Sequence, residues 1–165
     1  MLASVLSVGL AAPAIGATPA TLRLNGIGPL KLGMTRAAAV TTGWLADQGT
    51  GCELGGKPFP ITYGLSGASA PNGIRGTAQF MHGRLQVISF SRGVRTSTGV
   101  SVRHTKTSKM VSAYRQAGFS ASAKFDSTFG GTFVTVTRHG KDVIGGFAKR
   151  GVVIELGIPF IPVCD

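Results

Sequence analysis

The sequence predicts an α+β fold in which an antiparallel sheet carries helices packed on one face. Two repetitions support this prediction. Residues 30–35 lead into an alanine-rich stretch that reaches Trp44, and residues 100–105 lead into a similar stretch that reaches Tyr114. Residues 80–84 are echoed by residues 137–141, and each echo separates two β-rich segments. A tandem of two helix-plus-hairpin units explains both repetitions.

The first unit is predicted to begin with a short extended segment and a helix. Thr35 is suited to cap a helix that continues to about Ala46, and four residues at helical spacing form its expected buried face: Ala37, Val40, Thr41 and Trp44. Residues 47–76 are rich in glycine, proline and serine, which predicts a long loop with one strand near residues 60–63. Residues 77–81 and 85–90 are predicted strands.

Hairpin turns give the clearest local signals. His82-Gly83 separates the two strands of the first unit and fits a type I′ turn. In the second unit a helix is predicted over residues 107–117, followed by strands at 131–138, 141–148 and 152–157. These strands are joined by His139-Gly140 and by residues 149–151. We therefore expect units at 18–98 and 99–165 within one compact domain, with Trp44 and Tyr114 in equivalent places, each anchoring one helix on the sheet.

The N-terminal residues and the cysteines both suggest export. Residues 1–17 carry no charge, are almost wholly small or apolar, and end in Ile15-Gly16-Ala17, which is typical of a secretory signal peptide; a buried helix or a disordered tail is the alternative. The run is too short for a transmembrane anchor, so we expect no transmembrane segment in the mature chain. Two cysteines in an exported protein favour one disulfide, Cys52–Cys164, over two unpaired thiols.

Positive charge dominates the chain. The formal net charge is +11, and no acidic residue lies between Glu53 and Asp126. A surface of one sign favours anionic partners, although high charge also serves solubility alone. The candidate anionic-partner surface consists of Arg92, Arg95, Arg103 and Lys106. Aromatic residues are sparse there, so nucleic acid is not an expected partner.

The motif of residues 28–40 resembles a known family. Leu32-Gly33-Met34-Thr35 is similar to the opening of exported modules related to the SmpA/OmlA (BamE) domain, and the two-copy arrangement is similar to the beta-lactamase inhibitory protein fold. Arg103 and His104 replace glycine and methionine in the second copy. The chain most closely resembles uncharacterised secreted actinobacterial proteins. This resemblance implies an α+β fold and a binding role, and it transfers no contact residues.

Catalytic signals are weak. The acidic residues of the predicted mature chain are scattered, and the histidines at 82 and 139 fall in predicted turns. We expect no catalytic, cofactor-binding or metal-binding residues. The expected function is an exported non-catalytic binding module, inhibitor-like or associated with the cell envelope, whose partner is an extracellular protein or an anionic envelope component. The alternatives are a small exported hydrolase with a cryptic site in the 47–76 loop and a purely structural component of the envelope.

Overall fold

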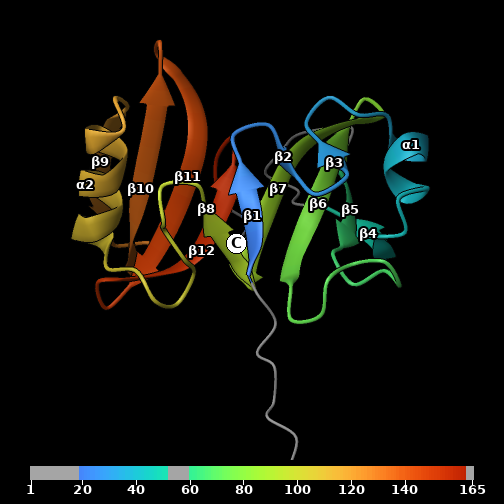
Figure 1. Ribbon diagram of the computed structural model, residues 1–165, viewed down its shortest axis with the longest axis horizontal. Coiled ribbons are helices and arrows are strands. Elements are labelled where there is room, and N and C mark those ends of the chain that lie inside the picture. The colour runs from blue at the N-terminus through green and yellow to red at the C-terminus, as the bar shows by residue number, and fades with distance from the viewer. Residues whose placement is uncertain (1–18, 52–59, 163–165) are drawn as a thin grey trace, which may run out of the picture.

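The protein is mostly β. The computed structural model describes residues 19–51 and 60–162 (Figure 1). An eight-stranded antiparallel sheet dominates it, with the spatial order β4 (Ala46–Thr50), β5 (Ile61–Gly64), β6 (Arg75–Met81), β7 (Arg84–Arg92), β12 (Val152–Ile158), β11 (Lys141–Lys149), β10 (Gly131–Arg138) and β9 (Ser120–Asp126). A smaller sheet has the order β3 (Leu30–Lys31), β2 (Gly26–Ile27), β1 (Ala20–Arg23) and β8 (Val94–Thr96).

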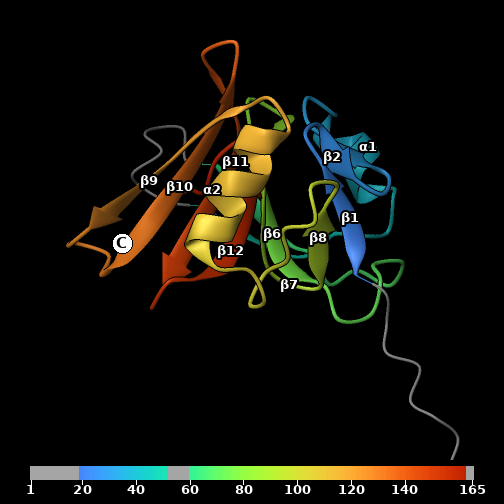
Figure 2. The ribbon, with the colours of Figure 1, turned by 60° about the vertical axis from the view of Figure 1, so that its left-hand side comes forward.

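The predicted α+β class is therefore wrong. The described residues contain two helices, α1 (Arg36–Val40) and α2 (Thr107–Gln116), and the covered face of the large sheet also carries the small sheet between them (Figures 1 and 2). Segments expected as turn, loop or connector form three of the strands, β2, β4 and β8, and β9 lies where no strand was expected. Helices alone do not cover this sheet.

The first helix is much shorter than expected. Thr35 caps it as predicted, since its hydroxyl accepts from the Ala38 amide at 3.3 Å. Thr41 and Thr42 then donate their hydroxyls to main-chain oxygens one turn back, at 2.8 and 2.6 Å, and Gly43 follows with φ +71°. Threonine hydroxyls that bond back to the helix backbone favour ending the helix, and so does a following residue with left-handed backbone. The buried face also differs, because Ala39 is buried whereas Val40 is 42% exposed.

The large sheet has a repeated topology. Each helix precedes four consecutive antiparallel strands, β4–β7 after α1 and β9–β12 after α2, and the two sets meet where β7 pairs with β12. The main-chain bonds at the start of each helix match as well. Gly33 N donates to Leu85 O at 2.7 Å, and Arg103 N donates to Val153 O at 2.7 Å. The division into units at residues 98 and 99 stays a prediction.

The second predicted echo aligned the wrong turns. The backbone amide of Arg36 at the start of α1 donates to Gly83, and the backbone amide of Thr107 at the start of α2 donates to Gly151, each at 2.9 Å. The counterpart of His82-Gly83 is therefore Arg150-Gly151, not His139-Gly140. All three pairs have positive φ at both positions, as the type I′ turn expected at His82-Gly83 requires, and the hairpin expected at His139-Gly140 is confirmed by the pairing of Arg138 with Lys141.

Trp44 and Tyr114 are both buried, but only one lies on a helix. Tyr114 is within α2 and is 1% exposed. Trp44 lies beyond the end of α1, is 8% exposed, and packs against Gly28 in the turn between β2 and β3. The prediction that Trp44 anchors the first helix is wrong; it fixes the small sheet instead.

The C-terminal part of the described chain crosses the sheet face opposite the helices. Gly145 and Gly157 are paired on β11 and β12, and a Cβ at Gly157 would clash with the carbonyl oxygen of Phe160. Glycine at these positions therefore lets the segment lie directly on the sheet. The predicted signal peptide (1–17), Cys52 and Cys164 lie outside the described residues.

Candidate functional site

The site begins with two arginines placed opposite each other. Arg75 starts β6 and Arg92 ends β7, and the two residues are paired in the antiparallel register. A regular hairpin around His82-Gly83 would place Arg75 opposite Phe90, but register shifts after Arg75 and after Gln79 bring Arg92 there instead. Like charges opposite each other on neighbouring strands repel. The pairing therefore concentrates positive charge at this end of the sheet.

Arg103 adds a third guanidinium group beside this pair. It takes φ +66°, the left-handed position that Gly33 occupies before α1. Its Nε donates to the main-chain oxygen of Ser91 at 3.2 Å, next to Arg92. Arg75 likewise donates from Nη1 to a main-chain oxygen, that of Ile74, at 2.9 Å. These bonds orient the guanidinium groups while leaving their charge unneutralised.

The turn between β11 and β12 completes the site. Lys149 ends β11, and Arg150 lies in the turn with φ +49°. Lys106 pairs with Val152 in an isolated bridge, which brings the start of α2 beside this turn. The Lys149 ammonium lies over the ring of Phe147, 6.0 Å from its centroid.

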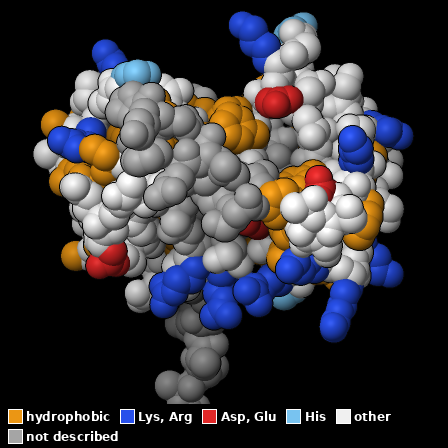
Figure 3. All heavy atoms as spheres, turned by 180° about the vertical axis from the view of Figure 1, so that it is seen from behind, with side chains coloured by type: hydrophobic (Ala, Val, Ile, Leu, Met, Phe, Trp, Pro, Cys, Tyr) orange, Lys and Arg blue, Asp and Glu red, His pale blue; other side chains and the backbone are white. Residues whose placement is uncertain are grey.

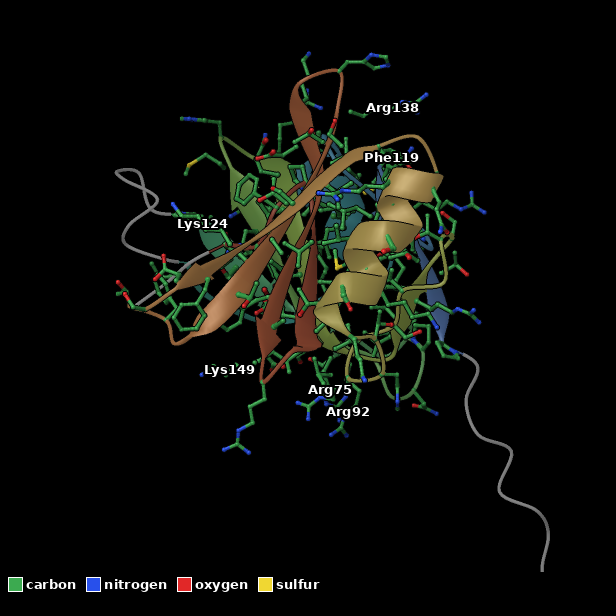
Figure 4. The ribbon with its side chains drawn as sticks, turned by 90° about the vertical axis from the view of Figure 1, so that its left-hand side faces the viewer. Arg75, Arg92, Phe119, Lys124, Arg138 and Lys149 are labelled. Carbon is green, nitrogen blue, oxygen red and sulfur yellow. The ribbon has the colours of Figure 1, made fainter. Side chains whose placement is uncertain are left out.

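We name this arrangement the basic row. Its members are exposed cations at one end of the large sheet: Arg75, Arg92, Arg103, Lys106, Lys149 and Arg150. Figure 3 shows Lys and Arg side chains gathered along this edge, and Figure 4 shows Arg75, Arg92 and Lys149 at the same end, away from Lys124 and Arg138. The start of α2 adds to the positive potential, because Lys106 makes no side-chain cap there, whereas Thr35 caps α1.

The row contains three of the four residues of the predicted anionic-partner surface: Arg92, Arg103 and Lys106. Arg95 is not part of it, because its side chain lies against Gly99 beside the small sheet. Sequence reasoning missed Arg75, Lys149 and Arg150. The turn signal at Arg150-Gly151 was visible, but its place beside Lys106 follows from pairing between distant segments.

Other polar groups form no comparable constellation. The three histidines are exposed, with His82 and His139 in turns and His104 just before α2. Ser66 donates to Asp47 at 2.8 Å on the surface of the region proposed for a hydrolase site. Among residues 19–51 and 60–162, no group of three His, Cys, Asp or Glu side chains is placed to hold a metal ion.

Glu155 is the described acid whose titration the fold changes most clearly. Burial raises the pKa of Glu155 above its ordinary value of 4.5, and a hydrogen bond to Ser89 partly opposes this. Ser89 itself lies 3.1 Å from the hydroxyl of Thr77. This polar cluster lies at the centre of the sheet, and its described hydrogen bonds suit a structural role.

Comparison with known proteins supplies no template for this site. Searches against protein-family models, characterised proteins and solved structures gave no significant match. The resemblance to BamE-like modules and to the beta-lactamase inhibitory protein fold therefore stays a prediction. No helix in the described part of the chain has the length and apolar character needed to cross a bilayer.

Proposed function

We propose that this protein is a non-catalytic binding module that recognises an anionic partner through the basic row. The observation that carries the proposal is the pairing of Arg75 with Arg92 and the addition of Arg103 through its bond to Ser91. Folding holds these charges close together despite their repulsion, which an anionic ligand would relieve. Guanidinium groups are well suited to this role because they bind carboxylates, sulfates and phosphates with paired donors.

Secretion or attachment to the cell envelope is part of the same proposal. It is supported by the uncharged segment at residues 1–17 and by the even cysteine count. Outside the cell, the available anionic partners include envelope polymers, lipid headgroups and acidic proteins. An acidic protein partner would be consistent with an inhibitor-like role.

The test is binding to anionic liposomes, cell-wall polymer and heparin at low and high salt. Wild-type protein should bind at least one of them. Binding should be weaker at high salt, because the distance over which exposed charges interact falls from about 8–10 Å at physiological ionic strength to about 3 Å at about 1 M salt. The double variant Arg92→Glu and Lys149→Glu should lose this binding and keep its melting temperature, since exposed substitutions rarely change stability by more than about 0.5 kcal/mol. The proposal would be contradicted if the double variant still bound, or if the wild-type protein bound none of the three ligands.

A further inference from the structure

The basic row is linear. It runs across the ends of four adjacent strands, from Arg75 on β6 through Arg92 on β7 to the start of β12 and Lys149 at the end of β11. Neighbouring strands lie about 4.8 Å apart, so the row spans about 14 Å in the direction perpendicular to the strands. A small anion would contact only part of this row. An extended polyanion lying across the strand ends would contact all of it.

The surroundings of the row do not suit a membrane surface. Peripheral membrane binding combines cations with apolar side chains that insert among the lipids. Among the described residues, three large apolar side chains are exposed: Val40 on α1, Phe160 in the C-terminal segment and Phe125 on β9. Phe125 lies at the same end of the sheet as Lys149, because it pairs with Thr132 and Thr132 pairs with Ala148, but β9 is two strands beyond β11 and outside the row. The four strands that carry the row, β6, β7, β12 and β11, therefore present charge without an exposed large apolar side chain of their own.

Base stacking is also disfavoured. The aromatic side chain that contacts the row is Phe147, and the Lys149 ammonium lies over its ring. The Phe147 ring is also packed against the Phe133 ring, with 4.8 Å between the ring centroids. Single-stranded nucleic acid binding normally pairs a cationic groove with free aromatic faces. Here the aromatic face is already used.

Small hydroxyl side chains accompany the cations. Ser91 lies next to Arg92, and Ser108 is exposed in the first turn of α2 beside Lys106. Hydroxyl groups both donate and accept hydrogen bonds, as sugar hydroxyls do. They also leave the longer cationic side chains accessible. These features match a chain that carries anionic groups and hydroxyls together.

We infer that the ligand of the basic row is a linear acidic polysaccharide, with carboxylate or sulfate groups repeated along the chain and bound across the ends of β6, β7, β12 and β11. This inference rests on the proposed function and specifies its ligand. It predicts dependence on ligand length, because a disaccharide contacts fewer cations than the row contains.

The experiment measures dissociation constants for heparin oligosaccharides of increasing length. Single-stranded DNA, a polyglutamate peptide and vesicles containing phosphatidylglycerol are the comparison ligands. Affinity should rise by about tenfold or more between a disaccharide and a hexasaccharide and exceed that for every comparison ligand, because each added ion contact releases counterions. The triple variant Arg75→Gln, Arg92→Gln and Lys149→Gln keeps only three of the six cations, so it should show a much weaker length dependence. The control, Arg36→Gln with Lys124→Gln and Lys141→Gln, carries the same charge change outside the row and should preserve it.

The outcomes separate this inference from the proposed function. Tighter binding of DNA, polyglutamate or vesicles would overturn the polysaccharide inference and leave the anion-binding proposal standing. Equal affinity for the disaccharide and the hexasaccharide would overturn the extended arrangement. Failure of all four ligand classes to bind would overturn both.

Discussion

Replacing Tyr114 with alanine should destabilise the protein strongly, whereas phenylalanine should be accepted. The Tyr114 ring is 1% exposed and meets Phe119 edge to face, with 5.7 Å between ring centroids. Truncating a buried aromatic side chain to alanine costs about 3–5 kcal/mol. For a chain of this size each kcal/mol corresponds to about 2–4 °C, so the melting temperature should fall by about 6–20 °C.

The hydroxyl group behaves differently from the ring. Within the described residues the Tyr114 hydroxyl is buried without a hydrogen-bond partner. Its neighbour Thr96 is already engaged, since its hydroxyl lies 2.9 Å from that of Thr98 and accepts from the Val100 amide at 3.1 Å. Burial raises the pKa of Tyr114 above its ordinary value, and the nearby hydroxyls of Thr96 and Thr98, which favour the ionised form, oppose this only in part. The hydroxyl therefore stays neutral, and its removal exposes no new unsatisfied group.

The assay is thermal unfolding of wild type, Tyr114→Ala and Tyr114→Phe, followed by circular dichroism at neutral pH. The phenylalanine variant should melt within a few degrees of wild type or above it. If Tyr114→Phe lowered the melting temperature as much as Tyr114→Ala, the hydroxyl would have to make a strong bond. The account of α2 packing would then be refuted.

Three further results are expected. Glu155→Gln should stabilise the protein at neutral pH, because burial disfavours the ionised Glu155 and glutamine carries no charge. The raised pKa of Glu155 means that wild-type stability falls as the pH rises from about 4.5 through the pKa in the folded state. If the variant kept the wild-type pH dependence of the melting temperature, this prediction would be contradicted. Gly157→Ala should displace the segment around Phe160 and speed its proteolysis, since a Cβ there clashes with backbone, and equal cleavage rates would argue against that contact. Arg150→Asn should fold normally whereas Arg150→Val should lower the melting temperature, because φ is +49° and asparagine tolerates this region better than a β-branched residue; equal melting temperatures would count against the turn geometry.

Local signals in the sequence predicted individual elements well. The expected helix at 107–117 is found at Thr107–Gln116, and the turns at His82-Gly83 and His139-Gly140 adopt positive φ at both residues. These features depend on a few neighbouring residues, such as a glycine that follows a residue tolerant of left-handed backbone. The amount of helix was overestimated because Thr41, Thr42 and Gly43 end α1 early.

Features that depend on distant segments were less predictable. The pairing of β7 with β12 joins strands about 60 residues apart in sequence, and nothing in either strand alone specifies it. Half of the candidate site was missed for the same reason. Arg75 meets Arg92 only because the β6–β7 register shifts, and Arg150 joins Lys106 only because Lys106 pairs with Val152.

The most direct test of the basic row is the salt dependence of heparin binding. If all six cations are engaged, affinity should fall by roughly 10³-fold between about 50 and 200 mM salt, and by only roughly 40-fold in the triple variant Arg75→Gln, Arg92→Gln and Lys149→Gln. The charge-matched variant Arg36→Gln, Lys124→Gln and Lys141→Gln should retain the wild-type slope. Equal slopes for the two triple variants would show that net charge alone governs binding, which would contradict the account.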